Sequence, residues 1–209
     1  MVANDAADDG TLYTSSRDFR SDTVTTPTAS MLAAMSQSSF RDDLYAEDTT
    51  TNEFQHYVAK LLGHEAGLFV SSGTMGNQLG VRMHLMQPPH SVVCDHRAHF
   101  RNDEAGAAAV ISQAIIIPVV PSNGLHLTLG DIEENVVLDD DIHYAPTKVI
   151  SLENTLGGII MPLTEVKRIS AWARSKGLKM HLDGARIWNA GECRPVVHVS
   201  VLDADINRL

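Results

Sequence analysis

Short apolar runs alternate with helical patterns along most of this chain. Five runs are predicted to be strands: residues 67–70, 91–94, 114–120, 148–152 and 178–182. The run 114–120 is continuously apolar, which is typical of a strand buried on both faces. Strands that alternate with helices are joined by crossovers. The sequence therefore predicts an α/β fold of three layers, with a mostly parallel sheet flanked by helices.

Two helices are predicted with clear ends. Thr50 and Glu53 have capping-box spacing before a helical pattern that continues to Gly63. Another helix is predicted to begin at Thr164 and to end at Lys176-Gly177. We expect the apolar stripes of both helices to lie in the core: Phe54, Tyr57, Val58, Leu61, Leu62, Val166, Ile169 and Ala173.

Composition excludes several classes of protein. The net charge of -10 argues against a nucleic-acid partner, and no apolar run is long enough for a membrane span. Cys94 and Cys193 form no disulfide framework and no zinc motif. Residues 1–16 are polar and acidic, unlike a targeting peptide, so we expect a flexible tail. Together these features predict a soluble, cytoplasmic protein.

Two segments could bind a ligand. Residues 71–77 place small residues and glycines between a predicted strand and a helix, where free N–H groups suit a phosphate; the alternative is an ordinary turn. Asp183 follows the last predicted strand, and Arg186 lies three residues on. This acid could keep a ring nitrogen protonated and the arginine could bind a carboxylate. The alternative is that Asp183 caps the next helix, with Arg186 on its solvated face.

The histidines are less informative by themselves. His99 follows a predicted strand and His143 precedes one, but the chain has ten histidines, and composition does not single out these two. Neither His64 with its neighbours nor His96 with His99 has the spacing of a zinc-binding helix, and the glutamate of that motif is missing, so no metal site is predicted.

Seven motifs in order nevertheless resemble those of the low-specificity L-threonine aldolases, which are fold-type-I enzymes dependent on pyridoxal 5'-phosphate (PLP). The resemblance covers about residues 19–190. The motifs are residues 19–27, 42–45, 72–77, 99–106, 140–144, 151–155 and 181–190.

The resemblance implies roles for the residues in these motifs. Gly73 and Thr74 would hold the cofactor phosphate, His99 would stack on the pyridine ring, and Asp183 would pair with the ring nitrogen. His143 would take the proton of the substrate β-hydroxyl, so His99 and His143 are the implied catalytic histidines.

The resemblance also implies a substrate and an assembly. Arg186 and Ser21 would bind the carboxylate of a β-hydroxy-α-amino acid, and Arg186 would also contribute to the cofactor site. Tyr45 would reach a neighbouring subunit's site in a homo-oligomer, either a dimer or a tetramer. The implied reaction cleaves L-threonine or L-allo-threonine to glycine and acetaldehyde.

The sequence departs from the family in its lysines. The family holds PLP as a Schiff base on a lysine roughly 30 residues beyond the Asp-Gly-Ala-Arg motif, which is residues 183–186 in this chain. None of the five lysines follows Asp183: they are Lys60, Lys148, Lys167, Lys176 and Lys179. We therefore expect no Schiff-base lysine in this chain and little activity from the chain alone.

The last segment also differs from the family. We expect residues 17–190 to form a partial PLP-binding domain and 191–209 to be divergent, with the small C-terminal domain absent, as in a truncated product. Residues 196–201 alternate like a short strand at a sheet edge. Two alternatives stay open: a non-catalytic remnant that binds PLP weakly or pairs with a full-length subunit, and another fold-type-I PLP enzyme.

Overall fold

The computed structural model describes residues 27–139, 141–185, 187 and 200–202, and the chain divides into two compact units between Thr50 and Thr51. The first unit contains α1 (Ala29–Ser36), whose N-cap Thr28 accepts a hydrogen bond from the backbone N–H of Met31. The predicted flexible tail (residues 1–16) and most of the divergent segment (residues 191–199 and 203–209) lie outside the described residues.

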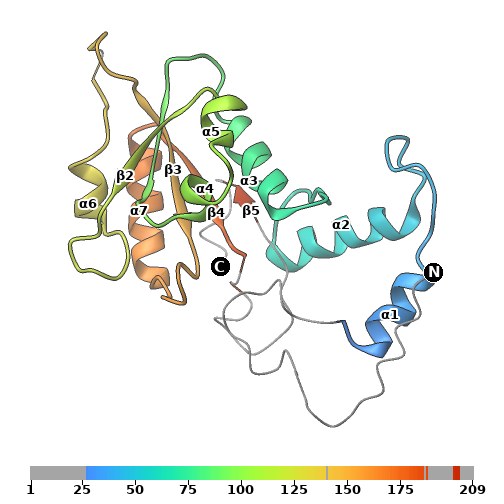
Figure 1. The fold of residues 1–209 in the computed structure, drawn as a ribbon. Coiled ribbons are helices and arrows are strands. Elements are labelled where there is room, and N and C mark those ends of the chain that lie inside the picture. The colour runs from blue at the N-terminus through green and yellow to red at the C-terminus, as the bar shows by residue number, and fades with distance from the viewer. Residues whose placement is uncertain (1–26, 140, 186, 188–199, 203–209) are drawn as a thin grey trace. The chain divides into compact units, whose positions relative to one another are not determined.

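The second unit is built on a five-stranded sheet (Figure 1). Its order is β2-β1-β3-β4-β5; β1 to β4 run parallel, and β5 runs antiparallel to β4. The strands are β1 (Ser91–Asp95), β2 (Ile115–Val119), β3 (Thr147–Glu153), β4 (Lys179–Asp183) and β5 (Ser200–Leu202). The expected mostly parallel sheet is confirmed. The alternating residues 196–201 contribute the first two residues of β5, and 196–199 lie outside the described residues.

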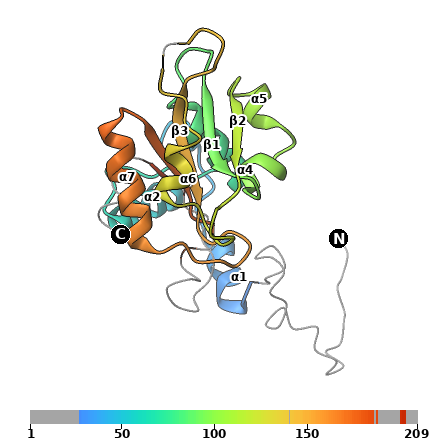
Figure 2. The same cartoon turned by 90° about the vertical axis from the view of Figure 1, so that its left-hand side faces the viewer.

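Helices cover both faces of this sheet. They are α3 (Gly73–Arg82), α4 (His99–Asn102), α5 (Ala107–Val110), α6 (Leu129–Glu133) and α7 (Leu163–Ser175), and they are preceded in the chain by α2 (Thr49–Leu62). Residues of α3, α4 and α5 pack with Val92 and Val149, whereas α6 and α7 pack on the opposite face. Figure 2 shows α7 and α5 on opposite sides of the strands. The predicted three-layer architecture is confirmed.

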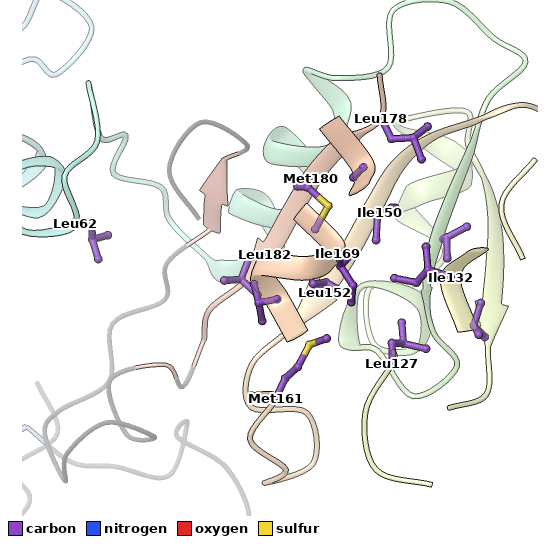
Figure 3. Packing of buried hydrophobic residues seen from close by; sticks show 14 residues of the cluster. Leu62, Leu127, Ile132, Ile150, Leu152, Met161, Ile169, Leu178, Met180 and Leu182 are labelled. Carbon is purple, nitrogen blue, oxygen red and sulfur yellow. The ribbon is translucent and has the colours of Figure 1, made fainter. Parts of the chain in front are cut away.

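The larger core lies between β3, β4 and α7 (Figure 3). Alternate residues Ile150, Met180 and Leu182 point to this layer, because successive side chains of a strand face opposite ways. Val166, Ile169 and Ala173 of α7 are buried, as predicted. The helix ends at Lys176-Gly177, where Gly177 has φ 72°, a left-handed conformation that favours glycine. No helix among the described residues is long and apolar enough to cross a membrane.

Two strand predictions were wrong. Residues 67–70 form no strand; the backbone N–H of Phe69 donates to the Gln55 side chain instead of to a neighbouring strand. β2 exists, but it is the edge strand and is not buried on both faces: Ile115 is 59% exposed. Its Pro118 lacks an N–H, which suits an edge position. A continuous apolar run predicts a strand but does not place it within the sheet.

The predicted core stripe of α2 was also partly wrong. Leu62 is buried, but Phe54, Tyr57 and Leu61 are exposed in the described structure. The helix begins at Thr49, so Thr50 lies in its first turn, and its hydroxyl accepts a hydrogen bond from Ser39 N–H.

Candidate functional site

The carboxyl ends of β3 and β4 bring two acidic residues side by side. Glu153 and Asp183 are register partners on the face covered by α3. Asp183 is buried, and its Oδ1 accepts a hydrogen bond from Ala185 N–H at 3.0 Å. Its Oδ2 accepts one from Nδ2 of Asn77 at 2.7 Å. The aspartate therefore accepts hydrogen bonds from the turn that follows it and from a helix far away in sequence.

Helix α3 also carries the predicted phosphate site. Ser72 is its N-cap, and the Ser72 hydroxyl accepts a hydrogen bond from Met75 N–H at 3.1 Å. Gly73 and Thr74 lie in the first turn, whose N–H groups have no acceptor within the helix. A cavity of about 350 Å³ borders Ser72 and Gly73. Asn77 lies one turn further along, about 6 Å in axial rise, so one helix carries both the candidate phosphate donors and the contact to Asp183.

A third carboxylate joins the cluster from the turn after α4. Glu104 accepts hydrogen bonds from Nδ2 of Asn77 at 2.9 Å and from Nε2 of Gln78 at 2.6 Å. Its Oε1 also lies 3.1 Å from Nδ1 of His99. The backbone N–H of His99 donates to Oε2 of Glu153 at 2.9 Å. The structure thus connects His99 to Asp183 through Glu104 and Asn77.

This network was not predicted from the sequence. Asn77 and Glu104 lie within motifs of the resemblance but were given no role, and Gln78 lies outside those motifs. One signal was available: Asn77 and Gln78 are adjacent polar residues where residues 71–77 lead into the predicted helix, and both are buried. Their partner Glu104 is 26 residues or more away, a pairing that local periodicity does not predict.

Behind Asp183 lies a buried layer of small polar groups. Nδ1 of His181 lies 2.9 Å from the hydroxyl of Ser151, and burial lowers the pKa of His181 to about 4. Its Nε2 has no hydrogen-bond partner among the described residues. On the next strand, burial raises the pKa of Cys94 to about 12. His181 and Cys94 in this layer are therefore uncharged at neutral pH.

His143 lies at the other end of the sheet. His143 precedes β3, which begins at Thr147. Glu153, the register partner of Asp183, is six residues further along, so the strand separates its two ends by about 20 Å. Figure 1 shows the loop before β3 at the end opposite to that carboxyl edge. His143 is exposed and lies 2.7 Å from Asp141, and hydrogen bonds from its backbone and ring lower the pKa of Asp141. The structure does not bring His143 to Asp183 within one chain, so its catalytic role stays a prediction.

The structure does not place the other predicted residues beside Asp183. Ser21 and Arg186 lie outside the described residues. Tyr45 belongs to the first unit, where it is exposed. Lys148 and Lys179 lie at the amino ends of β3 and β4, away from the carboxyl edge that bears Asp183. Among the described residues, no group of three His, Cys, Asp or Glu side chains could hold a metal ion.

Asp183 lies buried at the carboxyl end of β4, beside the start of α3. Open α/β proteins with a parallel sheet commonly bind their ligands at this edge, so the fold places the chain in that class of protein. The Beta-eliminating lyase family model matches residues 18–206. The chain therefore belongs to the Beta-eliminating lyase family, and the resemblance found from the motifs is confirmed.

Individual relatives agree with this family. The chain is 56% identical over 178 residues to the low specificity L-threonine aldolase of Saccharomyces cerevisiae, covering 85% of this chain and 46% of that one. It is 39% identical over 173 residues to the enzyme of the same name from Escherichia coli, covering 83% and 51%. A solved structure of a Leishmania major threonine aldolase matches with a TM-score of 0.72 at 25% identity, covering 90% of this chain and 54% of that one. The chain spans about half the length of the curated relatives it matches.

Proposed function

We propose that this chain carries the cofactor half of a PLP-dependent threonine aldolase site, which cleaves L-threonine or L-allo-threonine to glycine and acetaldehyde. The observation that supports this most is the link from helix α3 to Asp183, because Asn77 of that helix donates to the aspartate. The names of the relatives that match 83–85% of this chain support the substrate class.

The residues fit this cofactor. PLP needs an anion-binding site for its phosphate and a carboxylate for its pyridine nitrogen. Gly73 and Thr74 offer backbone N–H groups at a helix N-terminus, beside a cavity, and Asp183 offers a buried carboxylate near the next turn of that helix. The half-exposed His99 contacts Glu104, and Glu104 accepts a hydrogen bond from Asn77. Asn77 belongs to the helix that begins at Gly73 and also donates to Asp183.

Each residue then has a defined task. Asp183 would hold a proton on the ring nitrogen, and Gly73 and Thr74 would fix the phosphate. His99 would face the ring and set its orientation. When bound, PLP draws electrons from the substrate α-carbon, which weakens the bonds to that carbon.

The substrate side of the site rests on further residues. Arg186 and Ser21 would bind the substrate carboxylate, and Arg186 would also contact the cofactor. His143 would accept the hydroxyl proton as the Cα–Cβ bond breaks and the aldehyde leaves. Because His143 lies at the far end of β3 from Asp183, it would act on the site of a neighbouring subunit in a homo-oligomer. The family resemblance gives Tyr45 a place in a neighbouring subunit's site as well.

The test measures binding of PLP to this chain. We expect PLP to bind without a covalent bond and to leave on dialysis, because Lys148 and Lys179 lie at the amino ends of β3 and β4, away from Asp183. Asp183→Asn should weaken PLP binding at least about tenfold, since a hydrogen bond to a charged group contributes about 1.5–3 kcal/mol. Asp131→Asn is the matched control, because Asp131 is equally buried and caps α6 away from the site.

Two results would contradict the proposal. One is equal PLP affinity in Asp183→Asn and the unaltered chain. The other is no PLP binding at all by a chain whose circular dichroism shows a folded protein. A Schiff-base absorbance that survives dialysis would instead show that one of the five lysines holds the cofactor, contrary to the noncovalent binding expected here.

A further inference from the structure

We propose that Glu104 is a positioning residue, which fixes the imidazole of His99 with its proton on Nδ1 and couples this ring to Asp183 through Asn77. The inference deepens the proposed function and rests on it for the meaning of His99 and Asp183. The contact geometry itself comes only from the described residues.

The first observation is that Glu104 is fully enclosed by donors. Its side chain is 0% exposed. Oε2 accepts from Gln78, and Oε1 accepts from Asn77 and lies 3.1 Å from Nδ1 of His99. An ionised carboxylate can only accept hydrogen bonds, so a ring nitrogen that faces Oε1 must carry the proton. His99 Nδ1 is therefore the donor, and Nε2 is left as the acceptor of the neutral ring.

The second observation is that the groups around Glu104 adopt unfavourable arrangements. Gln78 turns its amide nitrogen to Glu104, and its Oε1 is buried with no hydrogen-bond partner in the described part of the chain. A buried acceptor without a partner destabilises the folded chain. The turn after Glu104 holds Ala105 at φ 52° and Gly106 at φ 73°, and the left-handed conformation is strained for an alanine. Because an unsatisfied oxygen and a strained turn accompany the placement of Glu104, we infer that this carboxylate does more than fill space in the core.

The third observation is that Asn77 connects the two ends of the site. One amide nitrogen donates both to Oε1 of Glu104 and to Oδ2 of Asp183. Its two hydrogens are thereby directed to two carboxylates from different elements. A movement of Glu104 therefore displaces the donor of Asp183 as well as the acceptor of His99.

Glu153 holds the backbone of His99. Its Oε2 accepts the backbone N–H of His99, while Glu104 contacts the ring. Glu153 anchors the backbone at His99, where α4 begins, and Glu104 determines which ring nitrogen carries the proton. For an imidazole that faces a cofactor ring, this choice decides that Nε2 is the nitrogen able to accept a proton.

The direct test reads the tautomer of His99 in the unaltered chain. Long-range ¹H–¹⁵N correlation spectra of the ¹⁵N-labelled chain, recorded at alkaline pH where an ordinary histidine is neutral, report which ring nitrogen is protonated. The His99→Gln variant assigns the signals. We expect the Nδ1–H form. A predominant Nε2–H form in the unaltered chain overturns the proposal without any variant having to fold.

A variant tests the cause. Glu104→Gln should shift the His99 signals away from a pure Nδ1–H form, because its amide can donate as well as accept. Glu165→Gln is the matched control: Glu165 is also buried and accepts hydrogen bonds, from Leu129 N–H and Arg168. Unchanged His99 signals in a folded Glu104→Gln variant overturn the proposal.

A binding measurement separates this proposal from the proposed function. Glu104→Gln should weaken PLP binding about tenfold, whereas Glu165→Gln should not. Weaker binding without a tautomer change would show a merely structural role and overturn the proposal. If the unaltered chain binds no PLP, the proposed function fails, while the spectra still decide the relationship between Glu104 and His99.

Discussion

The amide nitrogen of Asn77 lies 2.7 Å from Oδ2 of Asp183, although 106 residues separate the two in sequence. The same nitrogen lies 2.9 Å from Oε1 of Glu104. Two buried carboxylates from opposite parts of the second unit thus share one neutral donor. Without that donor, each carboxylate would lose a hydrogen bond, and the repulsion between their negative charges would be less well offset.

Asn77→Leu removes this donor while keeping a side chain of similar size. We expect the free energy of unfolding to fall by about 1–3 kcal/mol, because two buried acceptors lose a partner. Asn135→Leu is the control, since Asn135 is exposed and its amide donates to the Asp131 carbonyl, far from either carboxylate in sequence. Urea denaturation of both variants measures the difference. Equal stabilities of the two variants would contradict the role of Asn77.

The core between β3 and α7 makes a simpler prediction. Ile150 is 0% exposed on the central strand, so Ile150→Ala should lower the free energy of unfolding by about 2–5 kcal/mol. Ile142 is 92% exposed, and Ile142→Ala should change it by no more than about 0.5 kcal/mol. Thermal unfolding of the two variants makes the comparison. A destabilised Ile142→Ala variant would show that the loop before β3 is packed against something.

The fold was largely predictable because its signals are local. Four apolar runs became β1 to β4, and the stripe of α7 became core, since strand and helix periodicity are properties of neighbouring residues. The place of β2 at the edge was not predictable, because strand order depends on contacts between distant segments.

The candidate site was predictable only in part. Asp183 and Gly73 could be located because they follow a strand and begin a helix. The Glu104 network required knowledge of the fold. The placement of His143 was available from sequence, because a residue that precedes a parallel strand lies at the edge away from that strand's carboxyl end.

Cys94 is expected to be chemically silent in the folded chain. Burial raises its pKa from 9.0 to about 12, and only the thiolate reacts readily, so labelling at neutral pH should be slower by roughly a thousandfold than for an ordinary thiol. The Cys193→Ser variant leaves Cys94 as the single thiol of the sequence. Reaction with a disulfide reagent, with and without denaturant, measures the rate. Fast labelling of the folded chain would contradict the buried position.

His181 predicts how stability depends on pH. Burial lowers its pKa from 6.5 to about 4, so between these values the unfolded chain binds a proton that the folded chain does not. The contribution is complete above pH 6.5 and is lost as the pH falls through about 4. The difference of about 2.5 pKa values corresponds to roughly 3 kcal/mol of unfolding free energy.

The measurement compares urea denaturation at neutral pH and near pH 4 for three proteins. The unaltered chain should lose stability over this range, and His143→Asn should lose as much, because His143 is exposed. His181→Asn removes the group that titrates, while its side chain can still form a hydrogen bond with the Ser151 hydroxyl. It should therefore lose about 3 kcal/mol less than the unaltered chain between the two pH values, whatever its stability at neutral pH. An equal loss in all three proteins would show that carboxylates, and not His181, govern acid unfolding.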